Sequence, residues 1–373
     1  MEIGTITLIS FRNHNKTILN FDPNVTVIWG KNGSGKTSVL EAIYNLSIGK
    51  SFKTNTKKEL IKEGKNNFII KGVFKNSKNI KKEVYYYQNN KGKRKIKING
   101  KNVLNRKEMI GLNNVVVFSP EEENITKGYP KEKRRFFNKL FSICSKEYLN
   151  NLIVFNKTIK QRNTLLKNKN KLPKKQLIDL LKPWNEKYIQ TAVQIWKQRN
   201  FFLNDFKILF NKTSKEFDNK INIKIDFKEN EETRETFLKK IEKNIHKEII
   251  MKTTLLGPHK DRISFLFKNK SLKKHASQGE HKVFLAILKI TELLFINKKK
   301  QSCPIFLIDD LFANLDIDKS KKITDFLNEI KKTNKIKPQT IITTTDVISL
   351  KKNEFFKKGV ELKKHKLISG CKA

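Results

Sequence analysis

The sequence predicts an α/β fold whose two halves lie at opposite ends of the chain and are separated by a mainly helical segment. β-Branched and apolar runs typical of buried strands occur near both ends, at Val25–Trp29 and Ile305–Ile308. From Pro130 onward, apolar residues instead recur every three or four positions, as in helices. We therefore expect residues 1–125 and 251–373 to form the two halves of one α/β lobe, and residues 126–250 to form an inserted helical lobe.

The first part of the chain is expected to consist mostly of strands. β-Branched runs and alternating apolar residues are separated there by turn residues, and Asn99-Gly100 is a hairpin signal. The expected strands are Ile3–Ser10, Val25–Trp29, Phe68–Phe74, Glu83–Gln88, Lys95–Asn99 and Val115–Phe118.

The helical segment contains two apolar stripes with helical spacing. The first runs from Phe137 to Ile159, and the second runs from Trp184 to Leu209, starting just after Pro183. Lys167–Lys175 is a plausible connection between them. A strand at Ile221–Phe227 and a helix at Glu232–Lys252 follow.

The last part of the chain alternates between strand and helix signals, which is the α/β pattern. The expected elements are Ile263–Phe267, a helix at Gly279–Ile296, Ile305–Ile308, a helix at Asp318–Lys332, and Thr340–Thr344.

Composition indicates a folded chain with a polyanionic partner. The 373 residues suffice for about two domains, and 37% hydrophobic residues exclude a disordered chain. Lys and Arg total 80 against 36 acids, a net charge of +44, which favours nucleic acid. Only nine of the 80 are arginines, and lysines run through the whole chain, so part of the excess is typical of a compositional bias.

Several classes of protein are excluded by the sequence. No apolar run approaches the about 20 residues that a membrane span requires, and the N-terminus shows no secretory signal. Three widely separated cysteines, Cys144, Cys303 and Cys371, do not suggest a disulfide framework or a zinc site. We expect a cytoplasmic protein without membrane contact.

The strongest motif is a phosphate-binding loop. Val25–Trp29 leads into Gly30-Lys31-Asn32-Gly33-Ser34-Gly35-Lys36-Thr37-Ser38, and a helical sequence follows, as the motif requires. Glycines let the backbone wrap phosphates, and the helix N-terminus supplies a positive field. Lys36 is expected to reach the β- and γ-phosphates as a catalytic residue, and Thr37 to place its hydroxyl on Mg²⁺.

A second motif places two carboxylates after a buried strand. Asp309 and Asp310 follow Ile305–Ile308, where a phosphate-loop protein holds its metal ion. We expect Asp309 to bind Mg²⁺ because it closes the strand, and Asp310 to orient or deprotonate the attacking water.

A third motif, Ala276-Ser277-Gln278-Gly279-Glu280, precedes a helix. A Ser and a Gly at a helix start provide a hydroxyl and free N–H groups for an anion, although alone they form an ordinary cap. Because the phosphate loop already cradles one nucleotide, we expect Ser277, Gln278 and Gly279 to meet the γ-phosphate of a nucleotide bound by a second copy.

These motifs together resemble the head of an ABC-type ATPase, with a P-loop in a mixed β-sheet built from both chain ends. More narrowly, the chain resembles the bacterial RecF family, an SMC-like branch of recombination mediators, over essentially its whole length. The segment Ala313-Asn314-Leu315-Asp316 belongs to the resemblance to the ABC-type head. The segments that match the RecF family are Leu8–Asn13 with Phe11-Arg12-Asn13, Gly30–Thr37, Phe118-Ser119-Pro120-Glu121, Lys133-Arg134-Arg135-Phe136-Phe137, Gly257-Pro258-His259-Lys260-Asp261, Ala276–Gly279 and Leu307–Phe312.

The resemblance implies an ATP- and Mg²⁺-dependent homodimer with weak, DNA-stimulated ATPase activity. It also implies binding of single-stranded and gapped double-stranded DNA, and cooperation with RecR- and RecO-like partners in loading recombinase. The chain departs from the family pattern at Glu280-His281-Lys282, at Arg262, and at Thr343-Thr344-Thr345-Asp346.

Basic side chains are the candidates for DNA contact. A groove formed by a closed dimer would hold DNA phosphates through such side chains, and the candidates are Arg12, Lys53, Lys57, Arg134 and Arg135. An SMC-like chromosome organiser would need a long coiled coil between the two halves of its head. A transporter ATPase would have its Ser-x-Gly signature nearer the phosphate loop in sequence. An ATP-gated nuclease would need an additional acidic metal cluster downstream. A nucleotide-binding scaffold without significant turnover remains open.

Overall fold

The computed structural model describes residues 1–168, 173–310, 322–323, 325–329, 336–345, 359–363 and 366–368. The chain forms two compact units: unit 1 comprises residues 1–127, 213–219 and 275–373, and unit 2 comprises residues 128–212 and 220–274. Residues 251–274 were expected in the α/β lobe but belong to unit 2. The reason is strand pairing, because β10 (Ile263–Phe267) pairs with β9 (Ile223–Phe227) of the helical segment.

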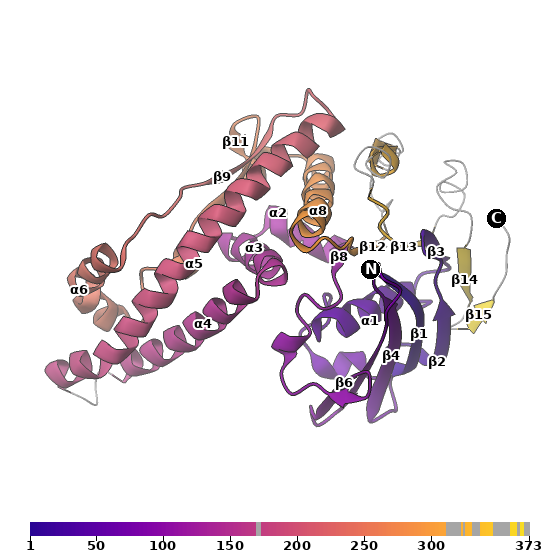
Figure 1. The fold of residues 1–373 in the computed structure, drawn as a ribbon, viewed down its shortest axis with the longest axis horizontal. Helices are drawn as coiled ribbons and strands as arrows, with labels where there is room; N and C mark the ends of the chain where they lie inside the picture. The colour runs from indigo at the N-terminus through magenta and orange to yellow at the C-terminus, as the bar shows by residue number, and fades with distance from the viewer. Residues whose placement is uncertain are drawn as a thin grey trace. The chain divides into compact units, whose positions relative to one another are not determined.

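Unit 1 contains a six-stranded sheet assembled from both ends of the chain, in the order β15-β14-β3-β13-β12-β8 (Figure 1). All neighbours are parallel except β14 and β15. Strands β8, β12 and β13 are buried along their whole length, which explains the apolar runs Val115–Phe118 and Ile305–Ile308. The strands are β3 (Val25–Trp29), β8 (Val115–Phe118), β12 (Ile305–Asp309), β13 (Thr340–Thr344), β14 (Gly359–Lys363) and β15 (Lys366–Ile368).

A second, antiparallel sheet of unit 1 has the order β2-β1-β4-β5-β6-β7. One face is buried and the other is partly exposed, which produces the alternation seen in the sequence. Asn99 and Gly100, both at positive φ, form the expected tight turn between β6 and β7. The strands are β1 (Glu2–Phe11), β2 (His14–Asn20), β4 (Asn67–Lys75), β5 (Lys81–Asn89), β6 (Arg94–Ile98) and β7 (Lys101–Asn102). Strand β2 was not expected from its mostly polar sequence.

The helices of unit 1 accompany these sheets. Helix α1 (Lys36–Ile48) follows the phosphate loop and is almost entirely buried. Helix α8 (Gln278–Lys300) follows the Ser277 motif, and its buried Lys289 pairs with Glu122 beyond β8 at 2.7 Å. The short α2 (Asn124–Lys127) ends where the chain leaves unit 1. The short α7 (Leu272–His275) begins in unit 2 and ends at the first residue of the returning unit 1 segment.

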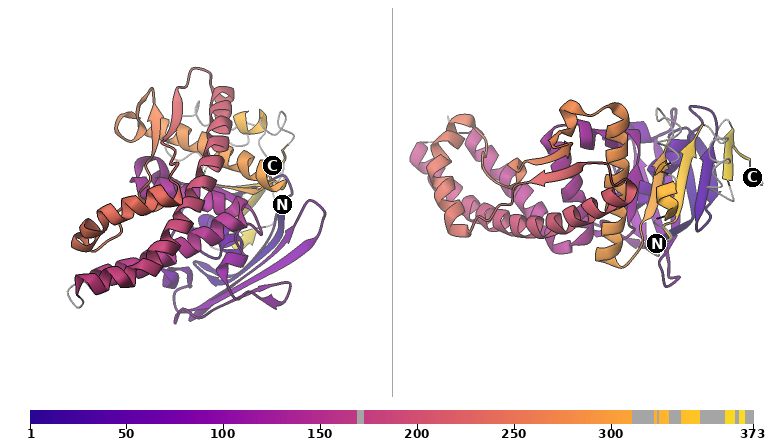
Figure 2. Two further views of the ribbon diagram at one scale, coloured as in Figure 1. Left: turned by 60° about the vertical axis from the view of Figure 1, so that its left-hand side comes forward. Right: turned by 90° about the horizontal axis from the view of Figure 1, so that it is seen from above.

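Unit 2 is mainly helical and carries a three-stranded antiparallel sheet of β11 (Lys270–Ser271), β10 and β9. Its helices are α3 (Pro130–Cys144), α4 (Lys146–Lys167), α5 (Lys174–Phe217, with its last turn in unit 1) and α6 (Arg234–Met251). Figures 1 and 2 show α4 and α5 running alongside each other, and Asn151 Nδ2 donates to Gln198 Oε1 between them.

Two helix boundaries differ from the expectation. The first apolar stripe is divided at Ser145, whose hydroxyl accepts a hydrogen bond from Tyr148 N and thereby starts α4. The expected helix start after Pro183 is wrong, because Pro183 lies inside α5. An interior proline costs about 3 kcal/mol. The turns before Pro183 stay helical because Leu177 and Leu181 pack in a buried cluster with Leu166 and Ile245. None of the described helices combines the length and apolar character needed to cross a lipid bilayer.

Candidate functional site

The phosphate loop connects β3 to α1 in unit 1 and curls tightly around its own lysine. Gly33 and Gly35 adopt φ values of 77° and 97°, which side chains rarely tolerate. Lys36 Nζ donates to the carbonyl oxygens of Gly30 at 2.8 Å and Lys31 at 3.1 Å. Burial lowers the pKa of Lys36, and the nearby charges of Asp310 and Asp309 oppose that shift. The loop thus presents a cation and backbone N–H groups at one point, as phosphate binding requires.

A cavity of about 260 Å³ opens above the loop, entirely within unit 1. It brings the loop and α1 together with both carboxylates and with residues from three other segments. Its lining residues are Arg12, Asn13, Asn32, Gly33, Ser34, Gly35, Lys36, Thr37, Ser38, Glu41, Lys53, Asp309, Asp310, Thr343 and Thr345. Ser277, Gln278 and Gly279 do not belong to this lining.

Asp309 and Asp310 lie at the cavity because β12 ends beside β13 in a parallel pair. Asp309 Oδ1 accepts hydrogen bonds from Thr37 Oγ1 at 2.9 Å and Thr343 Oγ1 at 2.5 Å. Burial raises the pKa of Asp309, while these two hydrogen bonds act in the opposite direction. Asp310 has a φ of 49°, an uncommon conformation for a non-glycine residue, and its N–H donates to Thr343 O at 3.1 Å.

The donor atoms at this point fit a Mg²⁺ ion shared with a phosphate. The Thr37 hydroxyl and the Asp309 carboxylate are hard oxygen ligands and already touch each other. Within the described part of the chain, no three His, Cys, Asp or Glu side chains gather closely enough to hold a metal by themselves. A site with so few protein ligands suits magnesium, because Mg²⁺ usually keeps water molecules and substrate oxygens as its other ligands.

The turn between β1 and β2 braces the loop from one side. Asn13 Nδ2 donates to Gly33 O at 2.9 Å, and the buried His14 places Nε2 3.1 Å from Gly35 O. Arg12 forms a two-pronged pair with the buried Glu41 of α1, with distances of 2.9 and 2.8 Å. Sequence reasoning missed Asn13, His14 and Glu41, because no spacing rule connects a hairpin turn to a phosphate loop.

Two predicted DNA contacts lie in this cavity. Arg12 is mostly buried there by its pair with Glu41, and Lys53 is an exposed part of the lining. Burial raises the pKa of Asp309, and the charge of Lys53 opposes that rise. Lys57 lies outside the lining, on the short 3₁₀ turn Lys57–Leu60, and is exposed.

The Ser277 motif forms an exposed helix start in unit 1. Ser277 Oγ accepts from Glu280 N at 3.2 Å, and Glu280 Oε2 accepts from Ser277 N at 2.7 Å, so the two residues form a capping box. Ser277 and Gln278 are exposed, and Gly279 is half-buried. The motif therefore leaves its helix start accessible, and it lies outside the lining of its own chain's cavity.

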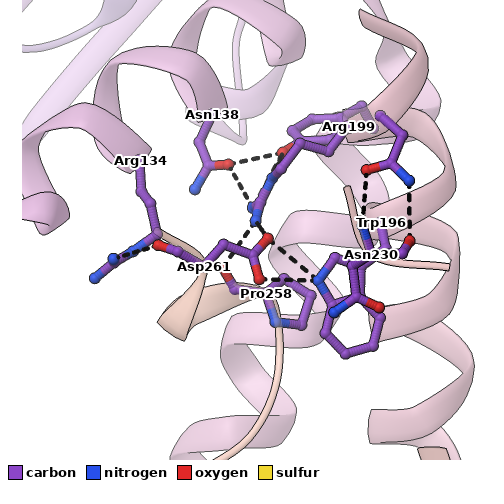
Figure 3. Close-up of polar contacts among 9 residues, drawn as sticks. Arg134, Asn138, Trp196, Arg199, Asn230, Pro258 and Asp261 are labelled. Carbon is purple, nitrogen blue, oxygen red and sulfur yellow. Dashed lines mark hydrogen bonds and ion pairs between the residues drawn. The ribbon is translucent and has the colours of Figure 1, made fainter. Parts of the chain in front are cut away.

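Arg134 and Arg135 of α3 belong to unit 2 and differ in their surroundings. Arg134 is half-buried and its Nη1 donates to Asp261 O at 2.8 Å. Figure 3 shows it beside a buried group in which Arg199 contacts the Asp261 carboxylate and Trp196 Nε1 donates to Asp261 Oδ1 at 3.0 Å. Arg135 is exposed and lies 3.6 Å from Glu132. The segment 311–316 and Asp346 lie outside the described residues.

Comparison with known proteins identifies the family. Residues 2–367 match the model of the RecF/RecN/SMC N terminal domain family. The chain is 34% identical over 358 residues to the DNA replication and repair protein RecF of Ruminiclostridium cellulolyticum, covering 93% of both chains. It is 30% identical over 374 residues to RecF of Lachnoclostridium phytofermentans, covering 99% of both. This chain belongs to the RecF family.

Solved structures agree with that assignment. A structure of the recombination mediator protein RecF with ATP, from the RecFOR pathway, matches with a TM-score of 0.86 and 27% identity, covering 98% of this chain and 96% of the other. An Smc head domain with an extended coiled coil, derived from Pyrococcus furiosus, matches with a TM-score of 0.58 at 16% identity, covering 98% and 95%, and supports the fold alone. The expected fold, an ABC-type ATPase head with an inserted helical lobe, is confirmed for this RecF-family chain.

Proposed function

We propose that this protein is an ATP-dependent, DNA-binding recombination mediator that closes as a homodimer when it binds ATP. The observation that carries the proposal is that the Ser277 motif is exposed and lies outside the lining of its own phosphate-loop cavity. A chain with half of a nucleotide sandwich facing outward needs a second copy to complete it. The solved relatives described as RecF with ATP, and with an ATP analogue, support ATP as the nucleotide.

Within each subunit, the phosphate loop would hold the triphosphate. Backbone N–H groups of residues 30–38 and Lys36 would neutralise its charge, and Thr37 and Asp309 would hold Mg²⁺. A Mg²⁺ ion held by Thr37 and Asp309 would supply positive charge against the negative charge that develops during hydrolysis. Asp310, at the cavity edge with its strained backbone, would orient or deprotonate the attacking water.

The partner subunit would complete the site through Ser277, Gln278 and Gly279. The Ser277 hydroxyl and the N–H groups of Gln278 and Gly279 lie at the start of the 23-residue α8, whose N-terminus favours a negative charge. Binding of the γ-phosphate there would link nucleotide state to dimer closure, because only ATP carries that group. Hydrolysis would then open the dimer.

Closure would create the DNA-binding state. We propose single-stranded and gapped double-stranded DNA as the substrates, weak DNA-stimulated hydrolysis, a cytoplasmic location, and RecR- and RecO-like proteins as partners. The RecFOR pathway named for the solved relative and the +44 charge of this chain support this set. Lys53, Lys57 and Arg135 are the exposed candidates for phosphate contact, whereas Arg12 and Arg134 have the local partners described above.

The proposal is tested by measuring dimer mass and ATP turnover, with and without gapped DNA. Lys36→Ala should abolish ATP binding and dimer formation. Ser277→Ala should preserve ATP binding by the monomer and prevent closure. Ser145→Ala is the matched control, because it removes a comparable serine cap from α4 in unit 2. Normal ATP-dependent dimerisation of the Ser277 variant would refute the trans site, and dimerisation without turnover would identify a scaffold.

A further inference from the structure

The antiparallel sheet of unit 1 has a partly exposed face that mixes tyrosines and isoleucines with lysines, although solvent-facing sheet surfaces are usually polar. The strand register fixes which residues share this face. One row crosses five strands as Ile18, Thr7, Lys71, Tyr85 and Lys97. The next row crosses the same strands as Lys16, Ile9, Ile69, Tyr87 and Lys95. We call these ten residues the tyrosine–lysine face; its strands are the group labelled β2, β1, β4 and β6 in Figure 1.

Tyrosine rings occupy the middle of this face and cations surround them. Tyr85 has Lys71 opposite it on one neighbouring strand and Lys97 on the other, and Lys71 Nζ lies 5.8 Å from the centre of the Tyr85 ring. Tyr87 lies two residues further along β5, about 7 Å away at the usual rise per residue. Both rings are half-buried, so each still presents accessible ring surface.

A cavity of about 330 Å³ lies at the same place. Its lining is Glu83, Tyr85, Lys95, Lys97 and Gly100. It combines an aromatic ring with two ammonium groups, and Glu83 is the acid at its edge. Because lysine is abundant everywhere in this chain, the lysines alone would not identify a binding surface. The rings and the exposed or half-buried isoleucines Ile9, Ile18 and Ile69 distinguish this face from an ordinary solvated surface.

We propose that the tyrosine–lysine face binds single-stranded DNA, with unpaired bases stacked on Tyr85 and Tyr87 and phosphates held by Lys71, Lys95 and Lys97. Aromatic platforms flanked by basic residues are how sequence-tolerant single-strand binding is achieved. A duplex does not fit, because its base faces are covered by stacking and only its polar backbone would meet the rings. An acidic peptide would use the lysines but leave the ring surfaces and isoleucines without an apolar partner.

This face differs from the ATP-gated clamp and does not require nucleotide. The choice of DNA over RNA rests on the proposed function, whereas the choice of a single strand rests on the rings. The test therefore uses the full-length Lys36→Ala protein without nucleotide, so that failure of the clamp proposal does not affect the result. Binding of a labelled oligothymidylate of about 20 nucleotides, longer than one typical single-strand site, is followed by fluorescence anisotropy. Oligouridylate and a duplex of equal length are the comparison ligands.

The tyrosines are tested with two double variants. Tyr85→Ala/Tyr87→Ala should raise the Kd for the single strand at least about 5-fold for each lost stacking contact. Tyr85→Phe/Tyr87→Phe keeps the rings and should bind as the parent does. Duplex affinity should change less than single-strand affinity. An unchanged Kd in the alanine variant, or an equal loss for the duplex, would overturn the proposal, and a clear preference for oligouridylate would replace DNA with RNA.

The lysines are tested through the salt dependence of binding. Replacing Lys71, Lys95 and Lys97 with Gln should lower the slope of log affinity against log salt by about 2, since each single-strand phosphate contact contributes about 0.7. Replacing Lys239, Lys243 and Lys247 on the exposed side of α6 removes the same charge from unit 2 and is the matched control. Equal effects of the two triple variants would show non-specific attraction and contradict the assigned face.

Discussion

The hydroxyl of Thr37 donates a hydrogen bond of 2.9 Å to the carboxylate of Asp309, although 272 residues separate the two in sequence. The contact exists because β3 and β12 both pair in parallel with β13, so the residues that follow these strands gather at one edge of the sheet. Thr343 adds a second hydroxyl to the same carboxylate oxygen from the end of β13 itself. The two motifs recognised at opposite ends of the sequence therefore form one site.

Asp309 and Asp310 should respond differently to removal of their charges. Asp309→Asn keeps an oxygen that can accept from Thr37 and Thr343 but loses the charge that would hold Mg²⁺. We expect the Mg²⁺ concentration needed for half-maximal ATP hydrolysis to rise about 10-fold or more. Asp310→Asn should leave that concentration unchanged and lower turnover at saturating Mg²⁺ by about 100-fold or more. ATPase assays across a Mg²⁺ titration distinguish the two, and identical profiles would contradict the separate roles.

Gly35 should be less replaceable than Gly33, although both have positive φ values. A Cβ on Gly35 would lie 2.7 Å from Nε2 of His14, whereas a Cβ on Gly33 would have no atom within 4 Å. Gly33→Ala should therefore cost only the backbone strain, about 1–2 kcal/mol. Gly35→Ala should destabilise the protein further and weaken ATP binding, because it displaces His14 from the loop.

A double variant tests this explanation. His14→Ala/Gly35→Ala removes the ring that the new Cβ would strike, so it should be less destabilised than the sum of the two single variants. Urea unfolding gives the free energies, and titration with a fluorescent ATP analogue gives the affinities. Additive costs would mean that the contact with His14 is not what makes Gly35 necessary.

His259 should make unit 2 less stable in acid. Burial chiefly lowers its pKa from 6.5 to about 4, while a hydrogen bond to Thr254 O opposes the shift and Lys260, Arg134 and Arg162 add to it. The unfolded chain therefore binds a proton at pH values where the folded protein does not. Stability is complete above about pH 6.5 and falls as the pH decreases toward 4, by up to about 3 kcal/mol.

Urea unfolding at pH 7.5 and 5.0 measures this dependence. His259→Gln should remove most of the difference between the two pH values, because the group that titrates is gone. The exposed His246→Gln, in the same unit, is the control and should retain the full difference. If the two variants behave alike, acid destabilisation arises from other groups.

Most of the fold could be predicted from the sequence because its local patterns of strands and helices are strong. Strands β3, β8, β10 and β13 have the bounds that their β-branched and apolar runs predict. Helix boundaries were less accurate. Pro183 suggested a helix start, yet the packing of Leu177 and Leu181 keeps the preceding turns helical. Tertiary contacts outweighed a local penalty there.

The candidate site divides in the same way. The phosphate loop and the Asp309–Asp310 pair were found from sequence, because phosphate and metal chemistry demands particular residues at fixed spacings. The turn residues Asn13 and His14 were not, because their role depends only on where the hairpin lies relative to the loop. Arg12 illustrates the same limit: its charge suggested DNA, but the buried Glu41 beside it decides where the guanidinium points.

By itself, the sequence determined the family, the nucleotide-binding loop and most of the strands and helices, since each follows from residue types at short range. Only the tertiary structure decided that Ser277 is exposed and outside the lining of its own loop's cavity, that Arg134 is engaged by the Asp261 backbone, and that Tyr85 and Tyr87 share a face with lysines from neighbouring strands. Those relationships depend on strand register and burial, which join residues distant in the chain and leave no local pattern in it.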